Sequence, residues 1–422
     1  MPHPFTILLG KAVRHAARLR GGGSALPGLF VEKISPDFIP SILSQLPKGV
    51  VVISGTNGKT TTTKMVVSLL ESQGLKVFTN RTGSNFTRGV AAALLGEIDT
   101  RGKLSADIAV LELDEAHAVK FVQIVKPRYS LLLNVMRDQL DRFGEIDTTA
   151  KMLQKIGEAT TDSVILNRED PRVASLATHL ATQNIAYFGL DSSLLSHFPT
   201  DDQLHNKQAA TASKLPAAAT LTEYGEDEAV FKIGKKSYAT PLKVRGAYNV
   251  YNGAAALALV QTILPEAPAE SLVTALADVT PAFGRGEVLT INGQPLELVL
   301  VKNPSGFQLS LESFSPKGHA TMIAVNDNYA DGRDMSWLWD VDFTSLKIDG
   351  VAAVSGVRAF DMALRLQYDE IAIGHVETSL VDSLKKLITA HPDMPKRIFC
   401  TYTAMLALRQ ELSKMTNVEV IS

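Results

Sequence analysis

Short runs of apolar residues alternate along the chain with longer segments in which apolar residues recur every three or four positions. The first pattern predicts buried strands, and the second predicts helices that cover them. The strands predicted in the first part of the chain are 50–53, 76–79, 108–113, 130–135, 164–167 and 185–188. Strands that alternate with helices predict a parallel, doubly wound α/β sheet with its ligand site at the carboxyl ends of the strands.

The segment between the first strand and the following helix has the composition of a phosphate-binding loop. It consists of Gly55, Thr56, Asn57, Gly58, Lys59, Thr60 and Thr61. The two glycines let the backbone turn tightly, so that its N–H groups and the positive end of the next helix face an anion. Lys59 can reach the outer phosphates of a nucleotide, and the Thr60 hydroxyl can bind Mg²⁺. An ordinary strand–helix turn would not explain a lysine at this position.

Further polar residues follow the other strands of this sheet. Glu112 interrupts an apolar strand, which indicates either a Mg²⁺ ligand or an outward-facing or salt-bridged glutamate. Arg137, Asp138, Asp141 and Arg142 crowd a strand-to-helix junction, and they predict either substrate and metal contacts or a cluster of caps and ion pairs.

Two pairs of polar residues are candidates for contact with the nucleotide base and sugar. Asn167 and Asp170 lie in a turn directly after a strand, where they can bind a nucleotide or cap the next helix. Asn249 and Asn252 open a long alanine-rich helix, and their amides can read an adenine edge or serve as caps.

The later part of the chain predicts a second, smaller α/β domain. Residues 193–224 are polar and alanine-rich without a steady period, so we expect a mobile loop or poorly ordered insertion there. Alternation at 229–233 and 236–239 predicts a hairpin. We place the domain boundary near the glycine-containing break at 284–287, which divides the chain into 1–45, 46–288 (with a variable insertion at about 193–240) and 289–422. The second set of predicted strands is 298–301, 322–325, 351–355, 371–373 and 397–400.

Two loops of this second domain stand at predicted strand ends. The loop that contains Lys302 and Asn303 is a candidate for substrate contact, and the other loop spans 326–340. Trp337 and Trp339 favour a protein-docking surface near Asp334, because tryptophan is enriched in interface anchors. Judged by its position alone, Asp334 fits a cap on the helix that begins near Met335 as well as it fits a role at this surface.

Composition limits the class of protein. The chain has 422 residues, of which 45% are hydrophobic and 20% are charged, as in a soluble globular protein. A net charge of −2 argues against a nucleic-acid partner. The single cysteine, Cys400, excludes a disulfide framework, and as the end of an apolar strand it is expected to be a buried structural thiol.

The first twenty residues have apolar residues at helical spacing with lysines and arginines between them. This pattern fits a transit peptide, a helix on a membrane surface or a docked leading helix. Because no small-residue cleavage site follows and glycines at 21–23 end the pattern, we expect a docked helix, with peripheral membrane contact as the alternative. No apolar run approaches the roughly 20 residues that a membrane span needs.

Taken together, these motifs resemble the MurT family, the Mur-ligase-like subunits of bacterial lipid II isoglutaminyl synthase. The resemblance covers nearly the whole chain and rests on the phosphate loop and on the motifs at 112–115, 137–145, 302–306 and 326–334. The short form of the phosphate loop is shared with the wider Mur ligase superfamily, which includes folylpolyglutamate synthases. The last two motifs distinguish the MurT family from the amino-acid-adding Mur ligases.

The resemblance implies a Mur-ligase-like ATP-binding domain and an ATP-dependent carbon–nitrogen ligase of cell-wall synthesis. Such an enzyme phosphorylates the α-carboxylate of D-glutamate in the lipid II stem peptide and amidates it to D-isoglutamine. It works as a heterodimer with a GatD-like glutaminase, in the cytoplasm at the inner face of the bacterial membrane. Residue by residue, the resemblance carries phosphate binding onto Lys59 and Thr60, magnesium binding onto Glu112, and completion of the partner's Cys–His pair onto Asp334.

The chain departs from related sequences in two respects. Many members of the MurT family carry a four-cysteine zinc ribbon in the central domain, and this chain has no cysteine there, so no zinc is expected. Gln139 stands where amino-acid-adding Mur ligases have a metal-binding histidine, so a second magnesium would need other ligands. The alternative functions are a Mur- or folylpolyglutamate-type ligase that adds an amino acid, and a non-catalytic ATP-binding scaffold.

Overall fold

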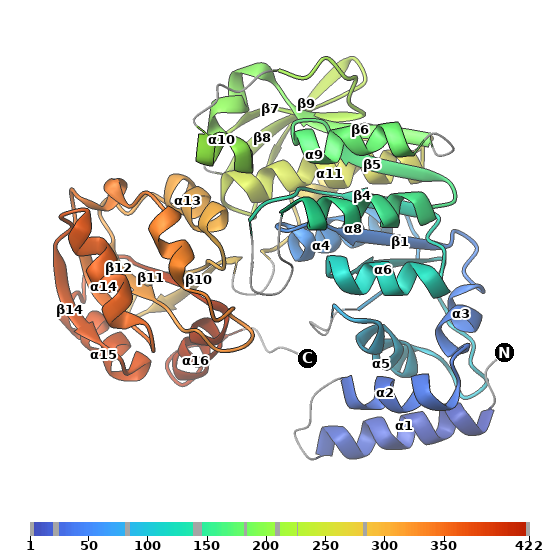
Figure 1. Cartoon of the computed structure of the whole chain (residues 1–422), viewed down its shortest axis with the longest axis horizontal. Helices are drawn as coiled ribbons and strands as arrows, with labels where there is room; N and C mark the ends of the chain where they lie inside the picture. The colour runs from blue at the N-terminus through green and yellow to red at the C-terminus, as the bar shows by residue number, and fades with distance from the viewer. Residues whose placement is uncertain are drawn as a thin grey trace.

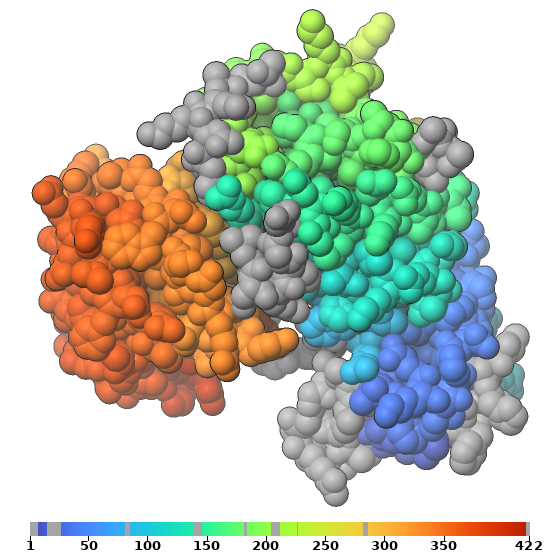
Figure 2. Space-filling view, viewed as in Figure 1, coloured from blue at the N-terminus to red at the C-terminus, as the bar shows by residue number. Residues whose placement is uncertain are grey.

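The computed structural model describes residues 4–19, 25–80, 85–137, 146–180, 184–206, 212–225, 227–281 and 285–418. They form two lobes, each built around its own sheet, which we call the first lobe (4–281) and the second lobe (285–418) (Figure 1). The orange and red surface of the second lobe stands beside the first lobe in Figure 2. The chain therefore has two α/β sheets, as its apolar pattern predicts.

The first lobe is organised around a nine-stranded sheet with the order β2-β3-β1-β4-β5-β6-β7-β8-β9. Its strands are β1 (Val50–Ser54), β2 (Val77–Thr79), β3 (Ile108–Glu112), β4 (Tyr129–Leu132), β5 (Ser163–Asn167), β6 (Asn184–Leu190), β7 (Ala219–Tyr224), β8 (Glu228–Ile233) and β9 (Lys236–Pro241). Pairing is parallel from β2 to β7, and β8 and β9 add an antiparallel hairpin at the edge. The central position of β1 puts the loop after it in the middle of the ligand-binding edge.

Helices cover both faces of this sheet. One face carries α4 (Lys59–Ser72), α11 (Ala247–Ile263) and α12 (Ala269–Leu276). The other carries α3 (Phe38–Leu43), α5 (Thr87–Glu97), α6 (Glu115–Ile124) and α8 (Ile146–Ala159). Shorter helical segments are α9 (Pro171–Ser175), η1 (Leu176–His179), η2 (Ser192–His197) and α10 (Asp201–Asn206).

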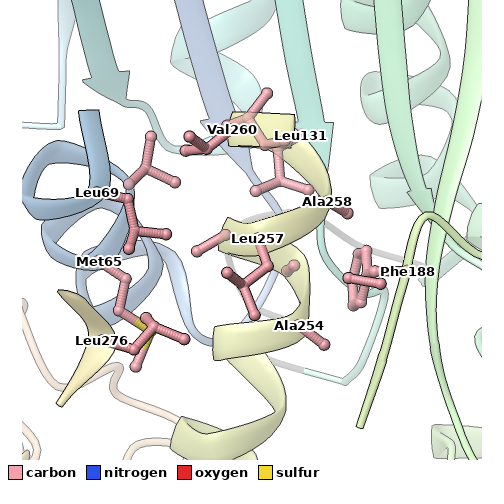
Figure 3. Close-up of a cluster of buried hydrophobic side chains, with 14 of the residues drawn as sticks. Met65, Leu69, Leu131, Phe188, Ala254, Leu257, Ala258, Val260 and Leu276 are labelled. Carbon is pink, nitrogen blue, oxygen red and sulfur yellow. The ribbon is translucent and has the colours of Figure 1, made fainter. Parts of the chain in front are cut away.

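The core beneath α4 and α11 fixes the position of the phosphate loop. Met65 and Leu69 of α4 meet Leu257 of α11 above Leu131 of β4, and all four side chains are buried (Figure 3). Small alanines on α11, among them Ala254, let this helix lie close to the sheet. The amino end of α4 is therefore anchored by burial of its own apolar face, at about 25 cal/mol per Å² of apolar surface.

The expectation of a mobile loop or poorly ordered insertion at 193–224 is wrong for the described residues of this segment, which leave out 207–211. This segment contains η2 and α10, and it ends in β7, which pairs parallel with β6. Ala219 and Leu221 are both fully buried, while Thr220 between them is not, so the strand has the usual alternation. Alanine at one of the two buried positions concealed that alternation in the sequence.

The second lobe contains a six-stranded sheet with the order β10-β11-β15-β12-β13-β14. Its strands are β10 (Arg285–Ile291), β11 (Gln294–Leu300), β12 (Ala320–Ala324), β13 (Val351–Ser355), β14 (Ile373–Glu377) and β15 (Lys396–Cys400). Its helices are α13 (Pro304–Ser313), η3 (Ser336–Asp340), η4 (Thr344–Leu346), α14 (Ala359–Tyr368), α15 (Leu380–Ala390) and α16 (Tyr402–Leu412).

Two details of the second sheet differ from the sequence-based expectation. The antiparallel strand β10 was not predicted, because it begins inside the glycine-containing break and has a register shift between Arg285 and Glu287. Strand β14 begins at Ile373, where the predicted strand 371–373 ends. The other strands of this sheet are parallel to their neighbours.

The leading helices α1 (Pro4–Leu19) and α2 (Ala25–Ile34) stack on α5 at one end of the first lobe (Figure 1). Ile7 is fully buried, and Lys11 Nζ donates to the Ile98 carbonyl at 2.6 Å. The helix α1 is thus docked on the protein. Among the residues that the structure describes, no helix is both long and apolar enough to cross a bilayer.

Candidate active site

The phosphate loop is a tight turn held by the segment after β4. Gly55 and Gly58 have φ angles of 136° and 88°, a region that favours glycine. Thr56 N–H donates to the Asn134 carbonyl at 3.0 Å, and Asn57 N–H donates to Asn134 Oδ1 at 2.8 Å. Asn134 in turn donates its amide to the Asn57 carbonyl at 3.0 Å. The segment after β4 therefore determines the shape of the loop.

Lys59 is buried at the start of α4, and its ammonium group is bound within the loop. Lys59 Nζ donates to the Gly55 carbonyl at 2.6 Å and lies 3.8 Å from Asp114 Oδ1 and 3.6 Å from Glu115 Oε1. Burial raises the pKa of Glu115 to about 7, and the charge of Lys59 opposes that rise. The sequence indicated the lysine but suggested no role for these two carboxylates.

Glu112 faces the phosphate loop from the end of β3. Thr60 Oγ1 donates to Glu112 Oε1 at 2.6 Å, and Asn85 Nδ2 donates to the same oxygen at 2.9 Å. Asn80 exchanges two hydrogen bonds with the Glu112 backbone, at 2.8 and 3.0 Å. The carboxylate is thus buried beside the hydroxyl predicted to share a metal ion with it, and it does not point outward.

Four candidate nucleotide-binding residues differ in what their side chains do. Asn167 donates to the Leu133 carbonyl and accepts from Tyr251, and Asp170 accepts from the Val135, Arg172 and Val173 N–H groups. Asn249 donates to the Arg245 carbonyl at 2.7 Å. These three side chains are engaged within the protein, which supports their capping and bracing roles.

Asn252 of α11 lies against the loop itself. A Cβ atom placed on Gly58 would approach Asn252 Oδ1 to 2.7 Å and Nδ2 to 2.8 Å. Asn252 is buried, with 6% of its surface exposed. Of the four candidates, it is the one whose amide touches the phosphate loop.

The second lobe reaches the phosphate loop through its first helix. Lys302 Nζ donates to the Thr56 carbonyl at 3.1 Å, and Asn303 Nδ2 donates to Asn57 Oδ1 at 3.1 Å. Asn303 Oδ1 also accepts from the Gly306 N–H at 2.7 Å and so caps α13. The structure therefore brings both residues, which are far away in sequence, to the loop.

Arg137 lies next to the loop, one residue after Met136, whose backbone bonds Thr56 Oγ1 through both its N–H and its carbonyl. Its own N–H donates to Asp201 Oδ1 at 2.8 Å, and its Nε lies 3.5 Å from Asp201 Oδ2. Asp201 belongs to the segment that looked uninformative in the sequence, so it was missed. The candidates Asp138, Asp141 and Arg142 and the position Gln139 lie outside the described residues.

Asp334 lies in the second lobe on an exposed loop. Its Oδ1 accepts from the Ser336 N–H at 2.9 Å, and hydrogen bonds from Ser336 lower the pKa of the Asp334 carboxyl. Nearby Asp331 is instead buried and accepts from the Thr403 N–H and hydroxyl. The Asp334 carboxylate is thus ionised and presented to the surface, in a geometry compatible with a local cap.

Cys400 is fully buried at the end of β15, and burial raises the pKa of its thiol far above the ordinary value. This agrees with the predicted structural thiol. Within the described residues, no three His, Cys, Asp or Glu side chains are grouped so that they could hold a metal ion by themselves.

Comparison with known families and proteins identifies the family. Residues 53–260 match the Mur ligase middle domain, and residues 300–405 match the MurT ligase C-terminal domain. Over 96% of its length the chain is 32% identical to the lipid II isoglutaminyl synthase (glutamine-hydrolyzing) subunit MurT of Streptococcus pneumoniae, 96% of which is covered. The chain belongs to the MurT family.

Two further similarities agree with this assignment. The MurT subunit of Staphylococcus aureus strain COL is 28% identical over 87% of this chain and 88% of its own length. A crystal structure of MurF from Acinetobacter baumannii has a TM-score of 0.70 at 19% identity, covering 92% of this chain and 80% of MurF. The predicted Mur-ligase-like α/β fold is confirmed, with two parallel sheets extended by antiparallel edge strands.

Proposed function

We propose that this MurT-family chain is the synthetase subunit of a lipid II isoglutaminyl synthase. It binds ATP at the phosphate loop, transfers the γ-phosphoryl group to the α-carboxylate of D-glutamate in the lipid II stem peptide, and amidates the resulting acyl phosphate. The observation that carries this proposal is the meeting of both lobes at one loop, where Lys302 contacts Thr56. A phosphoryl donor and a carboxylate acceptor need such a shared site.

The phosphate loop supplies the electrostatic part of phosphoryl transfer. The loop N–H groups, the amino end of α4 and Lys59 face the transferring phosphoryl group, whose equatorial oxygens carry the charge. Asp114 and Glu115 hold Lys59 in the structure, so its ammonium must pass from these carboxylates to the phosphates.

The residues present fit a magnesium ion. Glu112 Oε1 and Thr60 Oγ1 lie 2.6 Å apart, and Mg²⁺ at nucleotide sites uses one or two protein oxygens together with phosphates and waters. When bound, the ion neutralises charge on the β- and γ-phosphates. Asn85 and Asn80 orient Glu112 for this role through its side chain and its backbone.

The cationic residues beside the loop suit the acceptor. Arg137 and Lys302 come from different lobes, and a guanidinium binds a carboxylate through two parallel hydrogen bonds. A carboxylate oxygen attacks the γ-phosphorus and ADP leaves; ammonia then attacks the acyl carbon, and phosphate leaves with the former carboxylate oxygen. The product is D-isoglutamine.

Ammonia comes from a glutaminase partner of the GatD type. Cys400 is buried with a raised pKa and cannot supply the thiolate that glutamine hydrolysis needs. Asp334 completes the partner's Cys–His pair as the third member of a nucleophile–base–acid triad. The complex works in the bacterial cytoplasm at the inner face of the membrane, as the family resemblance implies.

An exposed apolar stripe beside Asp334 suits this partner. It consists of Trp339, Val357, Phe360, Leu364 and Tyr368, between 49% and 71% exposed. The last three lie four residues apart on one side of α14, and the rings of Tyr368 and Trp339 meet edge to face at 5.0 Å. Arg365 donates to the Leu338 and Val341 carbonyls and so ties the tryptophan segment to α14. Large apolar side chains exposed on one side of a helix in this way suit a docking site.

Paired variants of the reconstituted complex test this proposal. Asp334→Asn should abolish glutamine-dependent amidation of lipid II while excess ammonium chloride restores product, because the synthetase site is untouched. Asp342→Asn is the matched control, since Asp342 accepts from the Thr344 N–H at 2.9 Å in the same local geometry. Full glutaminase activity in Asp334→Asn would refute the triad role.

The docking stripe and the alternative functions are tested separately. Phe360→Asp should weaken partner binding by at least about tenfold, as expected for a lost aromatic anchor. Val288→Asp should leave partner binding unchanged. Val288 is an exposed apolar residue on β10, the edge strand at the other end of the sheet from β14. ATP hydrolysis that requires an amino acid, and not ammonia, would favour an amino-acid ligase; ATP-dependent assembly without amidation would favour a scaffold.

A further inference from the structure

Asp201 is a buried carboxylate that connects three segments of the chain beside the phosphate loop. Its side chain is only 2% exposed. The Arg137 N–H donates to Oδ1 at 2.8 Å, and the Ser305 hydroxyl donates to the same oxygen at 3.4 Å. Arg137 Nε faces Oδ2 at 3.5 Å. These groups come from the segment after β4, from α10 and from α13 of the second lobe.

A buried carboxylate is costly unless hydrogen bonds and an opposite charge compensate it. Here the compensation fixes one arginine twice, through its backbone and through its side chain. Arg137 keeps 40% of its side chain exposed while its Nε faces Asp201. An arginine whose Nε already faces a fixed carboxylate loses less rotamer entropy when its guanidinium binds an anion.

The position of Arg137 beside the phosphate loop explains what this restraint can do in the reaction. Met136 exchanges hydrogen bonds with Thr56 of the phosphate loop, and Arg137 is the next residue. The acceptor carboxylate must lie within about 3–3.5 Å of the γ-phosphorus when it attacks. The Arg137 guanidinium beside the loop can therefore align that carboxylate, provided that the guanidinium itself is held in one orientation.

We propose that Asp201 is a positioning residue that aims the Arg137 guanidinium at the acceptor carboxylate. Ser305 makes this alignment depend on docking of the second lobe, because its hydroxyl binds the same carboxylate oxygen. The segment 193–224 thus contributes to the synthetase site through α10. This inference rests on the proposed function, in which Arg137 binds the acceptor.

The test measures steady-state kinetics of the full chain with its glutaminase partner, using ammonium chloride as the nitrogen source. Asp201→Asn keeps the shape and removes the charge that faces Nε. The KM for lipid II should rise by about tenfold, the scale of a lost alignment, while the KM for ATP stays within about twofold. Asp202→Asn is the control, because this neighbour in α10 pairs with Arg172 and not with Arg137. Its KM for lipid II should not change.

A double-mutant cycle distinguishes positioning from general structural support. Arg137→Ala alone should raise the KM for lipid II, and adding Asp201→Asn should raise it no further, since Asp201 acts through Arg137. Effects that multiply in the double variant would overturn the inference. If Arg137→Ala raises the KM but Asp201→Asn does not, the inference fails and the proposed function stands. If Arg137→Ala leaves the KM unchanged, the acceptor assignment itself is wrong.

Should Asp201→Asn not fold, Ser305→Ala replaces it in the same cycle. This variant deletes one hydroxyl, and the KM for lipid II should rise about two- to threefold, as expected for one weak hydrogen bond. The rise should vanish in the Arg137→Ala background. An unchanged KM, or a rise that persists without Arg137, would overturn the inference.

Discussion

Gly58→Ala should weaken nucleotide binding by distorting the phosphate loop. Gly58 has a φ angle of 88° and precedes Lys59, the first residue of α4. Alanine is strained in this left-handed region, and its Cβ would lie 2.7 Å from Asn252 Oδ1. Either the loop or Asn252 must move.

The expected loss of nucleotide affinity follows from the backbone strain at position 58 and from the contact with Asn252. A left-handed residue other than glycine costs roughly 1–2 kcal/mol, and the loop can relieve this strain in the free protein by turning its N–H groups away from the anion. Nucleotide binding must then restore the strained shape. An energy of about 1–2 kcal/mol corresponds to an affinity lowered about 5- to 30-fold, and displacement of Asn252 adds to it.

Gly74→Ala is the matched control. Gly74 follows the other end of the same helix with a φ angle of 83°, and a Cβ atom added to it would have no other atom within 4 Å. It carries the same backbone strain without the contact and without the loop. Gly74→Ala should lower the free energy of unfolding by roughly 1–2 kcal/mol and leave nucleotide affinity unchanged, whereas Gly58→Ala should lose affinity for ADP or ATP in calorimetric titrations. Equal nucleotide affinity in the two variants would refute the reasoning.

Further predictions concern the metal, the lysine and the cysteine. Lys59→Ala should abolish amidation while the complex remains folded. Near-normal turnover would show that the loop takes no part in catalysis. Glu112→Gln keeps an acceptor for Thr60 and Asn85, so the unfolding temperature should hardly change. The magnesium concentration needed for half-maximal activity should rise about tenfold or more. An unchanged magnesium titration would show that Glu112 has only a structural role. Cys400 should react with thiol reagents only after unfolding, because its thiol is buried and its pKa is raised; rapid labelling of the native chain would contradict this. Elemental analysis should find no stoichiometric zinc in the purified chain, and about one zinc per chain after dialysis would contradict that.

The phosphate loop and most strands could be predicted from the sequence because their signals are local. The apolar run before Gly55 and the lysine after Gly58 are contiguous, so both the strand and the turn follow from a few residues. The strand β7 was missed because alanine fills one of its buried positions. The strand β10 was missed because it begins within a glycine-containing break.

The rest of the site could not be predicted because it is built by contacts between distant segments. Asn134 shapes the loop from the neighbouring strand, and Asp201 holds Arg137 from a segment without periodicity. From the sequence, Asn167 and Asp170 could be nucleotide ligands or caps, and in the structure their side chains brace the segment that carries Asn134. Polar residues at strand ends can bind ligands or brace the protein, and only the partners of their hydrogen bonds distinguish these two roles.

Transfer of a labelled oxygen tests the central claim most directly. Lipid II carrying ¹⁸O in the D-glutamate α-carboxylate is incubated with the complex, ATP, magnesium and ammonium chloride, and the released phosphate is analysed by mass spectrometry. If the carboxylate is activated as an acyl phosphate, each amide formed should release one phosphate that carries one of the labelled oxygens. Amide formation with unlabelled phosphate, or ATP hydrolysis without amide, would contradict the account.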